Sequence, residues 1–361
     1  MPLDEDLTAW LRLSLVPGLG SGDLRRLLTA YGSPAGALAA GRTELARHVA
    51  DPVAAAIRQG GSEEALAAVA AWLDDPANHI VTLADSHYPG QLLQIPDPPP
   101  LLYVKGRAEL LSRPALAVVG SRHATAQGTA NAESFARTFS DAGLTVVSGL
   151  ALGVDAAAHR GGLAGVASSV AVLGTGADIV DPARNRALAH ELAVRGALVS
   201  EFPLGTRPLA GHFPRRNRLI SGLSLGCLVV EAAAASGSLI TARLAAEQGK
   251  DVFAIPGSIH SPLAKGCHAL IKQGAKLVES AWDVLEELRL PAPATAAPAD
   301  PADAGQALAL LDALGHDPCD ADTLAARSGL SAAETAALLT QFELEGRIET
   351  LPGGLYQRVH R

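Results

Sequence analysis

The sequence predicts an α/β protein in which a doubly wound, Rossmann-like parallel sheet follows an all-helical domain and precedes a C-terminal winged helix. Three observations predict this fold. From about residue 114 to residue 288, short apolar runs ending in glycine alternate with helical patterns, as in parallel strands joined by helices. Before this region, apolar residues recur at helical spacing. After it, three helical patterns precede two short strand-like runs around a Pro-Gly-Gly turn.

The first predicted domain spans residues 1–85 and is helical, with the patterns LTAWLRLSLV, DLRRLLTAYG and EEALAAVAAWL. Within it, VPGLGSGDLRRLL resembles a helix-hairpin-helix motif, because residues 17–20 form a tight turn. Ser21 could cap the second helix, whose free amide groups could hold a phosphate. A tight connection in a small helical bundle accounts for the same glycines.

The second predicted domain spans residues 86–290 and contains the sheet. It begins with a proline-rich segment, in which Pro98, Pro99 and Pro100 exclude a helix or a central strand. Buried strands are predicted for ALAVVGSR, LTVVSGLALG, VAVLGTG, CLVVEA and DVFAIPG. Right-handed crossovers make the sheet parallel, so a ligand site is expected beyond the carboxyl ends of the strands.

The last region consists of a Pro/Ala linker, residues 291–303, and a winged helix, residues 304–361. A helix that enters a DNA groove normally presents basic or amide side chains. The candidate here, SAAETAALLTQFELEG, contains no Lys or Arg and carries Glu334, Glu343 and Glu345. We therefore expect this module to contact protein or to regulate, and not to recognise duplex DNA directly.

The predicted strand ends carry groups that bind anions. Glycine-rich turns follow four strands, and in two of them small polar residues or an arginine accompany the glycine. The stretch HFPRRNRLISG adds three arginines and an aromatic ring to a chain with a formal net charge of -8. A phosphate-bearing ligand, bound by a local basic patch, is therefore expected.

Other kinds of site are disfavoured. The text GSRHATAQG fails the spacing of a dinucleotide fingerprint, and no GxxxxGK[ST] motif occurs. Asp155 and His159 share a helical face, but further metal ligands are lacking, so an internal hydrogen bond that orients the SGLALG turn is expected instead. We expect no catalytic residue, metal or cofactor. Scattered cysteines, the missing leader and the lack of long apolar segments predict a cytoplasmic protein with no membrane association.

Several motifs occur in a fixed order over residues 114–280, namely VVGSR, SGLALGVDAAAH, SEFPLG, FPRRNRLISGLS, VVEAAAASGSLITA, AIPGS and LIKQGA. In this order they resemble the DNA-processing protein A family (DprA, also called Smf). The flanks resemble the sterile-alpha-motif-like N-terminal domain and the winged helix of its longer members. The resemblance implies a protein that binds single-stranded DNA, protects incoming DNA and loads RecA recombinase onto it in natural transformation and recombination. It does not imply an enzyme.

Transferred onto this sequence, the family's DNA-binding pocket falls on three segments, with the residues Gly120, Ser121, Arg122, Phe213, Arg215, Asn217, Arg218, Ser236, Gly237 and Ser238. Arg215 and Arg218 are expected to neutralise phosphates, while Phe213 stacks on a base. Arg216 is expected to point away and pair with a carboxylate such as Glu201 or Glu231. For any one of these arginines, a structural salt bridge is the alternative.

The resemblance also implies a homodimer through a late apolar segment, with Leu263, Leu270, Ile271 and Leu277 at the interface. Packing within the core is the alternative for these residues. The rival function is a nucleotide-processing enzyme of the phosphoribohydrolase type, which uses a related sheet. The chain has AIPGSIHSP where those enzymes carry a PGGxGTxxE motif, and this difference disfavours the rival.

Overall fold

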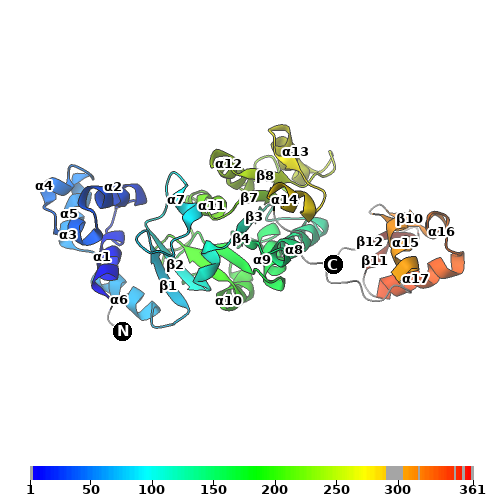
Figure 1. The fold of residues 1–361 in the computed structure, drawn as a ribbon, viewed down its shortest axis with the longest axis horizontal. Coiled ribbons are helices and arrows are strands. Elements are labelled where there is room, and N and C mark those ends of the chain that lie inside the picture. The colour runs from blue at the N-terminus through cyan, green and yellow to red at the C-terminus, as the bar shows by residue number, and fades with distance from the viewer. Residues whose placement is uncertain (1–2, 290–303, 316–317, 345–346, 352–353, 359–361) are drawn as a thin grey trace. The chain divides into compact units, whose positions relative to one another are not determined.

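The computed structural model describes residues 3–289, 304–315, 318–344, 347–351 and 354–358 (Figure 1). They form two compact units, one up to residue 293 and one from residue 294 onward. The predicted linker, residues 291–303, lies outside the described residues. No helix in the described part of the chain is long and apolar enough to cross a membrane.

The first unit begins with a bundle of short helices: α1 (Glu5–Ser14), α2 (Ser21–Tyr31), α3 (Pro34–Ala39), α4 (Arg42–Leu45), α5 (Asp51–Gln59) and α6 (Glu63–Trp72). Trp10, Leu11 and Leu27 are buried in its core. The same core continues onto Leu101 and Tyr103 of a neighbouring strand. The helical bundle therefore packs directly on one end of the sheet.

The sheet of the first unit has the strand order β1-β2-β6-β5-β4-β3-β7-β8-β9. Its strands are β1 (Asn78–Thr82), β2 (Leu101–Gly106), β3 (Ala115–Val119), β4 (Thr145–Ser148), β5 (Ser169–Val172), β6 (Ala197–Ser200), β7 (Gly226–Val229), β8 (Asp251–Ala254) and β9 (Lys276–Leu277). All pairings among β3 to β9 are parallel. The predicted doubly wound parallel sheet is confirmed, and its order reverses between β3 and β7.

Helices cover both faces of this sheet (Figure 1). They are α7 (Gly90–Leu93), α8 (Ala126–Asp141), α9 (Val154–Ala164), α10 (Arg186–Arg195), α11 (His212–Gly222), α12 (Ser238–Glu247), α13 (Lys265–Lys272) and α14 (Ala281–Glu287). In strand β3, Ala117 and Val119 pack with α11, α12 and α13, whereas Leu116 and Val118 pack with α8, α9 and α14. The central strand is thus buried on both sides, which explains its continuous apolar sequence.

Four strands of this sheet escaped sequence prediction, namely β1, β2, β6 and β9. β1 lies in a range expected to be helical, and β2 follows the proline-rich segment. These two strands pair with each other, and β2 pairs with β6, always in antiparallel fashion. β1 has the β-branched run Ile80, Val81 and Thr82, which favours a strand over the helix expected there. The sheet accordingly begins before residue 85.

The second unit contains α15 (Ala304–Leu314), β10 (Cys319–Asp320), α16 (Ala321–Ser328), α17 (Ala332–Leu344), β11 (Ile348–Leu351) and β12 (Leu355–Arg358). The strands form a small antiparallel sheet in the order β10-β12-β11. Leu310, Leu324, Phe342 and Ile348 are buried in its own core. Three helices and a hairpin form the predicted winged helix. Glu345 lies outside the described residues.

Candidate nucleic-acid interface

A cleft of about 600 Å³ lies where the strand order reverses, beyond the carboxyl ends of β3 and β7. Of the residues predicted to bind phosphate and base, all except Arg215 and Arg218 line it: Gly120, Ser121, Arg122, Phe213, Asn217, Ser236, Gly237 and Ser238. The sequence did not predict that Ala151 and Thr241 line this cleft, although both lie beside its glycine-rich turns. A single cleft therefore collects three segments that are far apart in the chain.

The first turn of the cleft is held tightly at the end of β3. A Cβ added at Gly120 would lie 2.7 Å from Val154 Cγ2 and 2.9 Å from the carbonyl oxygen of Glu231, so only glycine fits. The Ser121 amide donates to that carbonyl at 2.7 Å. The Glu231 carboxylate accepts from the Thr125 amide at 2.9 Å and from its hydroxyl at 2.7 Å. The end of β7 therefore fixes the turn that precedes α8.

A cation and an aromatic face stand together on one wall of the cleft. The exposed Arg122 guanidinium carbon lies 5.6 Å from the centre of the Phe213 ring, which is a cation–π distance. Behind the ring, the backbone of Gly174 leaves room for it, because a Cβ there would approach the ring to 3.0 Å. The glycine-rich turn at residues 174–176, which follows β5, thus supports Phe213 and does not itself line the cleft.

The opposite wall is built from the turn before α12. The hydroxyls of Ser236 and Ser238 are hydrogen-bonded at 2.7 Å. Asn217 on α11 donates its side-chain amide to the Gly237 carbonyl at 3.4 Å, which links the two walls. Small side chains and backbone groups at this wall leave it open to a ligand with hydrogen-bond acceptors.

Arg216 forms the floor of the cleft, and the prediction that it points away and pairs with Glu201 or Glu231 was wrong. The residue is only 4% exposed, and its Nη1 donates to the Val172 carbonyl at 2.7 Å. It pairs with neither Glu201 nor Glu231; its opposite charge is the buried carboxylate of Asp155. A Cβ at Gly149 would lie 1.9 Å from Arg216 Nη1, so glycine is required above it. Burial lowers the pKa of Arg216 to about 10, and Asp155 opposes that shift.

Asp155 and His159 orient the SGLALG turn, as predicted. Asp155 accepts from the amides of Gly149 at 3.2 Å and Ala151 at 3.3 Å. His159 Nε2 accepts from the Leu150 amide at 3.3 Å, while Nδ1 lies 2.7 Å from the Ser169 hydroxyl. Burial raises the pKa of Asp155, and burial together with the Arg216 charge lowers the pKa of His159 to about 3. The histidine is therefore neutral and structural. The described residues contain no His, Cys, Asp and Glu cluster that could hold a metal ion.

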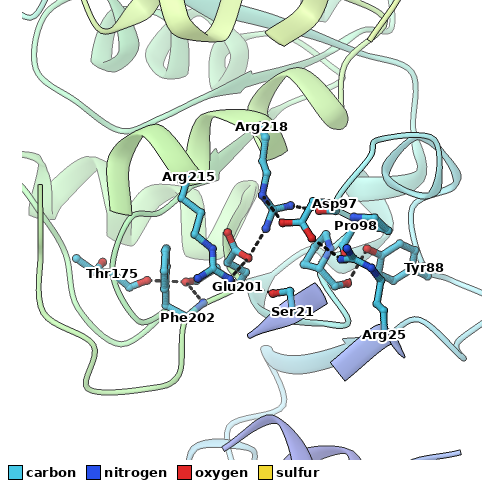
Figure 2. Close-up of polar contacts among 12 residues, drawn as sticks. Ser21, Arg25, Tyr88, Asp97, Pro98, Thr175, Glu201, Phe202, Arg215 and Arg218 are labelled. Carbon is cyan, nitrogen blue, oxygen red and sulfur yellow. Dashed lines mark hydrogen bonds and ion pairs between the residues drawn. The ribbon is translucent and has the colours of Figure 1, made fainter. Parts of the chain in front are cut away.

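Arg215 and Arg218 face away from the cleft, into an ion-pair network (Figure 2). The Glu201 side chain is 1% exposed, and its Oε2 accepts from Arg215 at 2.9 Å and also from Arg218. Arg218 pairs in addition with Asp97 at 3.5 Å. A buried carboxylate is costly without a counter-charge, and these arginines supply it. The structure does not bring them to the cleft, and the alternative of structural salt bridges accounts for their placement.

The residues predicted to form a dimer interface differ in exposure. Leu270 and Ile271 on α13 are partly buried against the main core, as the core alternative requires. The Leu263 carbonyl accepts from the Ala232 amide at 2.7 Å. Leu277 is 44% exposed and lies on β9, the last strand of the sheet. Self-association through this edge stays a prediction, with Leu277 its most accessible residue.

Comparison with known proteins decides the family. The protein-family model described as DNA recombination-mediator protein A matches residues 79–289, and the family model of the DprA winged helix domain matches residues 292–354. The chain belongs to the DNA recombination-mediator protein A family. Protein Smf of Escherichia coli (strain K12) is 44% identical over 299 residues, which cover 80% of each chain. DNA processing protein DprA of Streptococcus pneumoniae is 47% identical over 206 residues, covering 57% of this chain and 73% of that protein.

Solved structures agree with this membership. The X-ray structure of DprA from Streptococcus pneumoniae matches with a TM-score of 0.69 at 36% identity, and covers 80% of this chain and 99% of that one. A Helicobacter pylori DprA structure, described by its single-stranded DNA binding mode, matches with a TM-score of 0.54 at 29% identity, covering 58% and 96%. Membership of this family gives the chain a DNA-processing role in recombination.

Proposed function

We propose that this DprA-family chain binds single-stranded DNA in the cleft between β3 and β7. The observation that carries the proposal is the meeting of Arg122, the Phe213 ring and the Ser236–Ser238 turn around one opening. Proteins that bind single strands without sequence preference combine phosphate contacts with aromatic faces on which bases stack. The single-stranded DNA binding mode described for the Helicobacter pylori relative supports the same ligand.

Each wall of the cleft has its own task in this proposal. Arg122 neutralises a phosphate, and Phe213 stacks on a base beside it. Ser121 and one hydroxyl of the hydrogen-bonded pair Ser236 and Ser238 donate hydrogen bonds to phosphate oxygens. The charge of buried Arg216 makes the electrostatic potential at the floor of the cleft more positive, because water screens a buried charge least.

The bound strand then passes to a recombinase. We propose that the chain protects incoming DNA and loads RecA onto it during natural transformation, as a cytoplasmic homodimer that uses the β9 edge. The winged helix contributes protein contacts or regulation, since α17 carries Glu334 and Glu343 and no basic residue. RecA loading is measured as the rate of RecA filament formation on single strands covered by single-strand-binding protein, with and without this chain.

The proposal assigns binding and no catalysis to the cleft. Asp155, the carboxylate at its floor, neighbours Arg216, and its Oδ2 already accepts two backbone amides in holding the turn. Incubation with nucleoside monophosphates tests the rival enzyme directly. Release of free base would contradict a binding-only role.

Equilibrium binding of labelled single and double strands at physiological salt tests the proposal as a whole. Single strands should bind at least tenfold more tightly than a duplex of the same length, which corresponds to about 1.4 kcal/mol. A chain truncated after residue 291 should keep most of this affinity, and residues 304–361 alone should not bind duplex DNA. Tight duplex binding by the latter fragment would assign DNA recognition to the winged helix instead.

A further inference from the structure

A second pocket, of about 360 Å³, lies where the helical bundle meets the sheet. One side consists of the turn between α1 and α2, and the other of the proline-rich segment and the loop after β6. Its apolar walls are Val16, Pro17, Leu24, Pro99, Pro100, Phe202 and Pro203. The volume falls at the lower end of the roughly 300–1,000 Å³ that small-molecule sites occupy. Arg215 also lines this pocket, whereas its neighbour Arg216 lines the cleft.

Two buried polar atoms of the pocket lack a hydrogen-bond partner among the described residues. They are the hydroxyl of Tyr103 and Oε1 of Glu201. Tyr103 is 1% exposed, and so is the Glu201 side chain. Leaving such groups unpaired costs about 1–3 kcal/mol each in a folded protein. Both residues line the same pocket, so a ligand inside it can satisfy a carboxylate acceptor and a phenol together.

The mouth of the pocket is suited to a phosphate. The α2 helix has 11 residues and begins after Gly20 with no side-chain cap, so its first amides are open to an anion. Ser21 does not cap α2, contrary to the sequence-based expectation; its hydroxyl accepts from Arg215 at 3.0 Å (Figure 2). The Arg215 side chain is 44% exposed and points toward this turn.

The local charge favours an anion at the mouth. In the network of Figure 2, the guanidinium groups of Arg25, Arg215 and Arg218 face the carboxylates of Asp97 and Glu201. Three positive charges against two negative ones leave one positive charge in excess. Arg215 is its most exposed arginine at 44%, because Arg218 is 12% and Arg25 25% exposed.

We propose that this pocket binds one nucleoside phosphate, with its base against the prolines and its phosphate against Arg215 and the start of α2. The inference rests on the proposed binding of single strands, in which Arg215 and Arg216 lie on two sides of α11. A strand that leaves the cleft over α11 reaches this pocket, because Arg216 lines the one and Arg215 the other. A free nucleotide has the same chemistry, and the experiment below separates the two sources.

The free groups distinguish cytosine from thymine. The carboxylate oxygen of Glu201 accepts from an exocyclic amine, as carboxylates do from N4 of cytosine. Thymine carries a carbonyl oxygen at that position, which a carboxylate repels. Cytosine should therefore bind better than thymine, by about fivefold for one net hydrogen bond.

The test compares oligo-dC with oligo-dT of equal length by fluorescence anisotropy, and dCMP with dTMP by calorimetry. Wild-type protein should prefer oligo-dC about fivefold. Tyr103→Phe removes only the unpaired hydroxyl, so it should weaken oligo-dC binding while leaving the melting temperature unchanged or higher. Ser21→Phe should block the mouth and abolish the preference. Tyr31→Phe, which removes a hydroxyl from the same helical bundle outside the pocket, serves as the control and should change neither property.

The outcomes distinguish this inference from the proposed function. If oligo-dC binds better than oligo-dT but dCMP binds no better than dTMP, the pocket takes a nucleotide of a DNA strand. If dCMP also binds better than dTMP, the pocket takes free nucleotides as well. Binding of dCMP without binding of either oligonucleotide supports the pocket and contradicts the proposed function. If Tyr103→Phe and Ser21→Phe both keep wild-type dC affinity and preference, the pocket binds no nucleotide and the inference is overturned.

Discussion

Arg122 and Arg218 should respond in opposite ways to replacement by alanine. Arg122 is exposed at the cleft, where its guanidinium lies over the Phe213 ring. Its loss should cost at most about 1 kcal/mol of stability, the value of an exposed cation–π pair. Arg218 is 12% exposed and balances the buried Glu201 carboxylate. Its loss should destabilise the fold by about 3 kcal/mol, as expected when one partner of a buried ion pair is removed.

The magnitude for DNA binding follows from counterion release. Each neutralised phosphate contributes about 0.7 to the slope of log K against log salt for single strands. Between about 50 and 200 mM salt, one such contact accounts for about a 2.6-fold loss of affinity. Arg122→Ala should therefore lower the slope by about 0.7, whereas Arg218→Ala should leave the slope of the folded fraction unchanged.

The assay is fluorescence anisotropy with a labelled single strand at four or five salt concentrations, combined with urea unfolding of each variant. The sequence placed both arginines in the DNA-binding pocket, and the structure separates them. If Arg122→Ala keeps the wild-type slope, the cleft is misassigned. If Arg218→Ala flattens the slope at wild-type stability, the ion-pair network does not hold Arg218 in solution.

Three further predictions concern the floor of the cleft and the sheet edge. Gly149→Ala should lower stability by about 1–3 kcal/mol, because its Cβ would overlap Arg216, while Gly211→Ala, which has open space, should be neutral in urea unfolding. His159 has a folded-state pKa of about 3, and an unfolded histidine titrates near about 6.5. As pH falls below about 6.5, the unfolded state alone gains a proton at this histidine. The free energy of unfolding should therefore be about 2 kcal/mol lower at pH 5 than at pH 7.5. His159→Gln should remove this loss. Leu277→Lys should give a folded monomer by light scattering, and an unchanged dimer mass would exclude the β9 edge.

The strand ends and their glycine turns were predictable because their constraints are local. Gly120 must lack a Cβ where β3 meets Val154, and the apolar run before it marks a strand buried on both faces. Parallel strands bring their carboxyl ends to one edge, so the turns at Gly120 and Gly237 had to be neighbours once the order reversed between β3 and β7.

The directions of the side chains on α11 depended on helical phase and on partners distant in sequence. Phe213 and Asn217 are four residues apart and share the face toward the cleft. Arg215 and Arg218 are three apart and share the face toward Glu201. Arg216 lies between these faces and points under the Gly149 turn. The sequence revealed the cluster of charges, but the buried position of Glu201 after β6 decided which arginines it would hold.

Strand β2 was missed for a different reason. Leu102 and Val104 of β2 join the main core, while Leu101 and Tyr103 pack against the helical bundle. The strand is therefore apolar on both sides, and its proline-rich approach masks it in the sequence. The unpaired hydroxyl of Tyr103 could not be foreseen, because it depends on how the bundle docks on β2.

Photo-crosslinking of a single strand that carries 5-bromodeoxyuridine, followed by mass spectrometry, tests the central claim most directly. A strand bound in the cleft should crosslink to peptides that contain Phe213, Arg122 or residues 236–238, and Phe213→Ala should remove the first of these crosslinks. Crosslinks confined to α17 and the β11–β12 hairpin of the winged helix would contradict binding in the cleft.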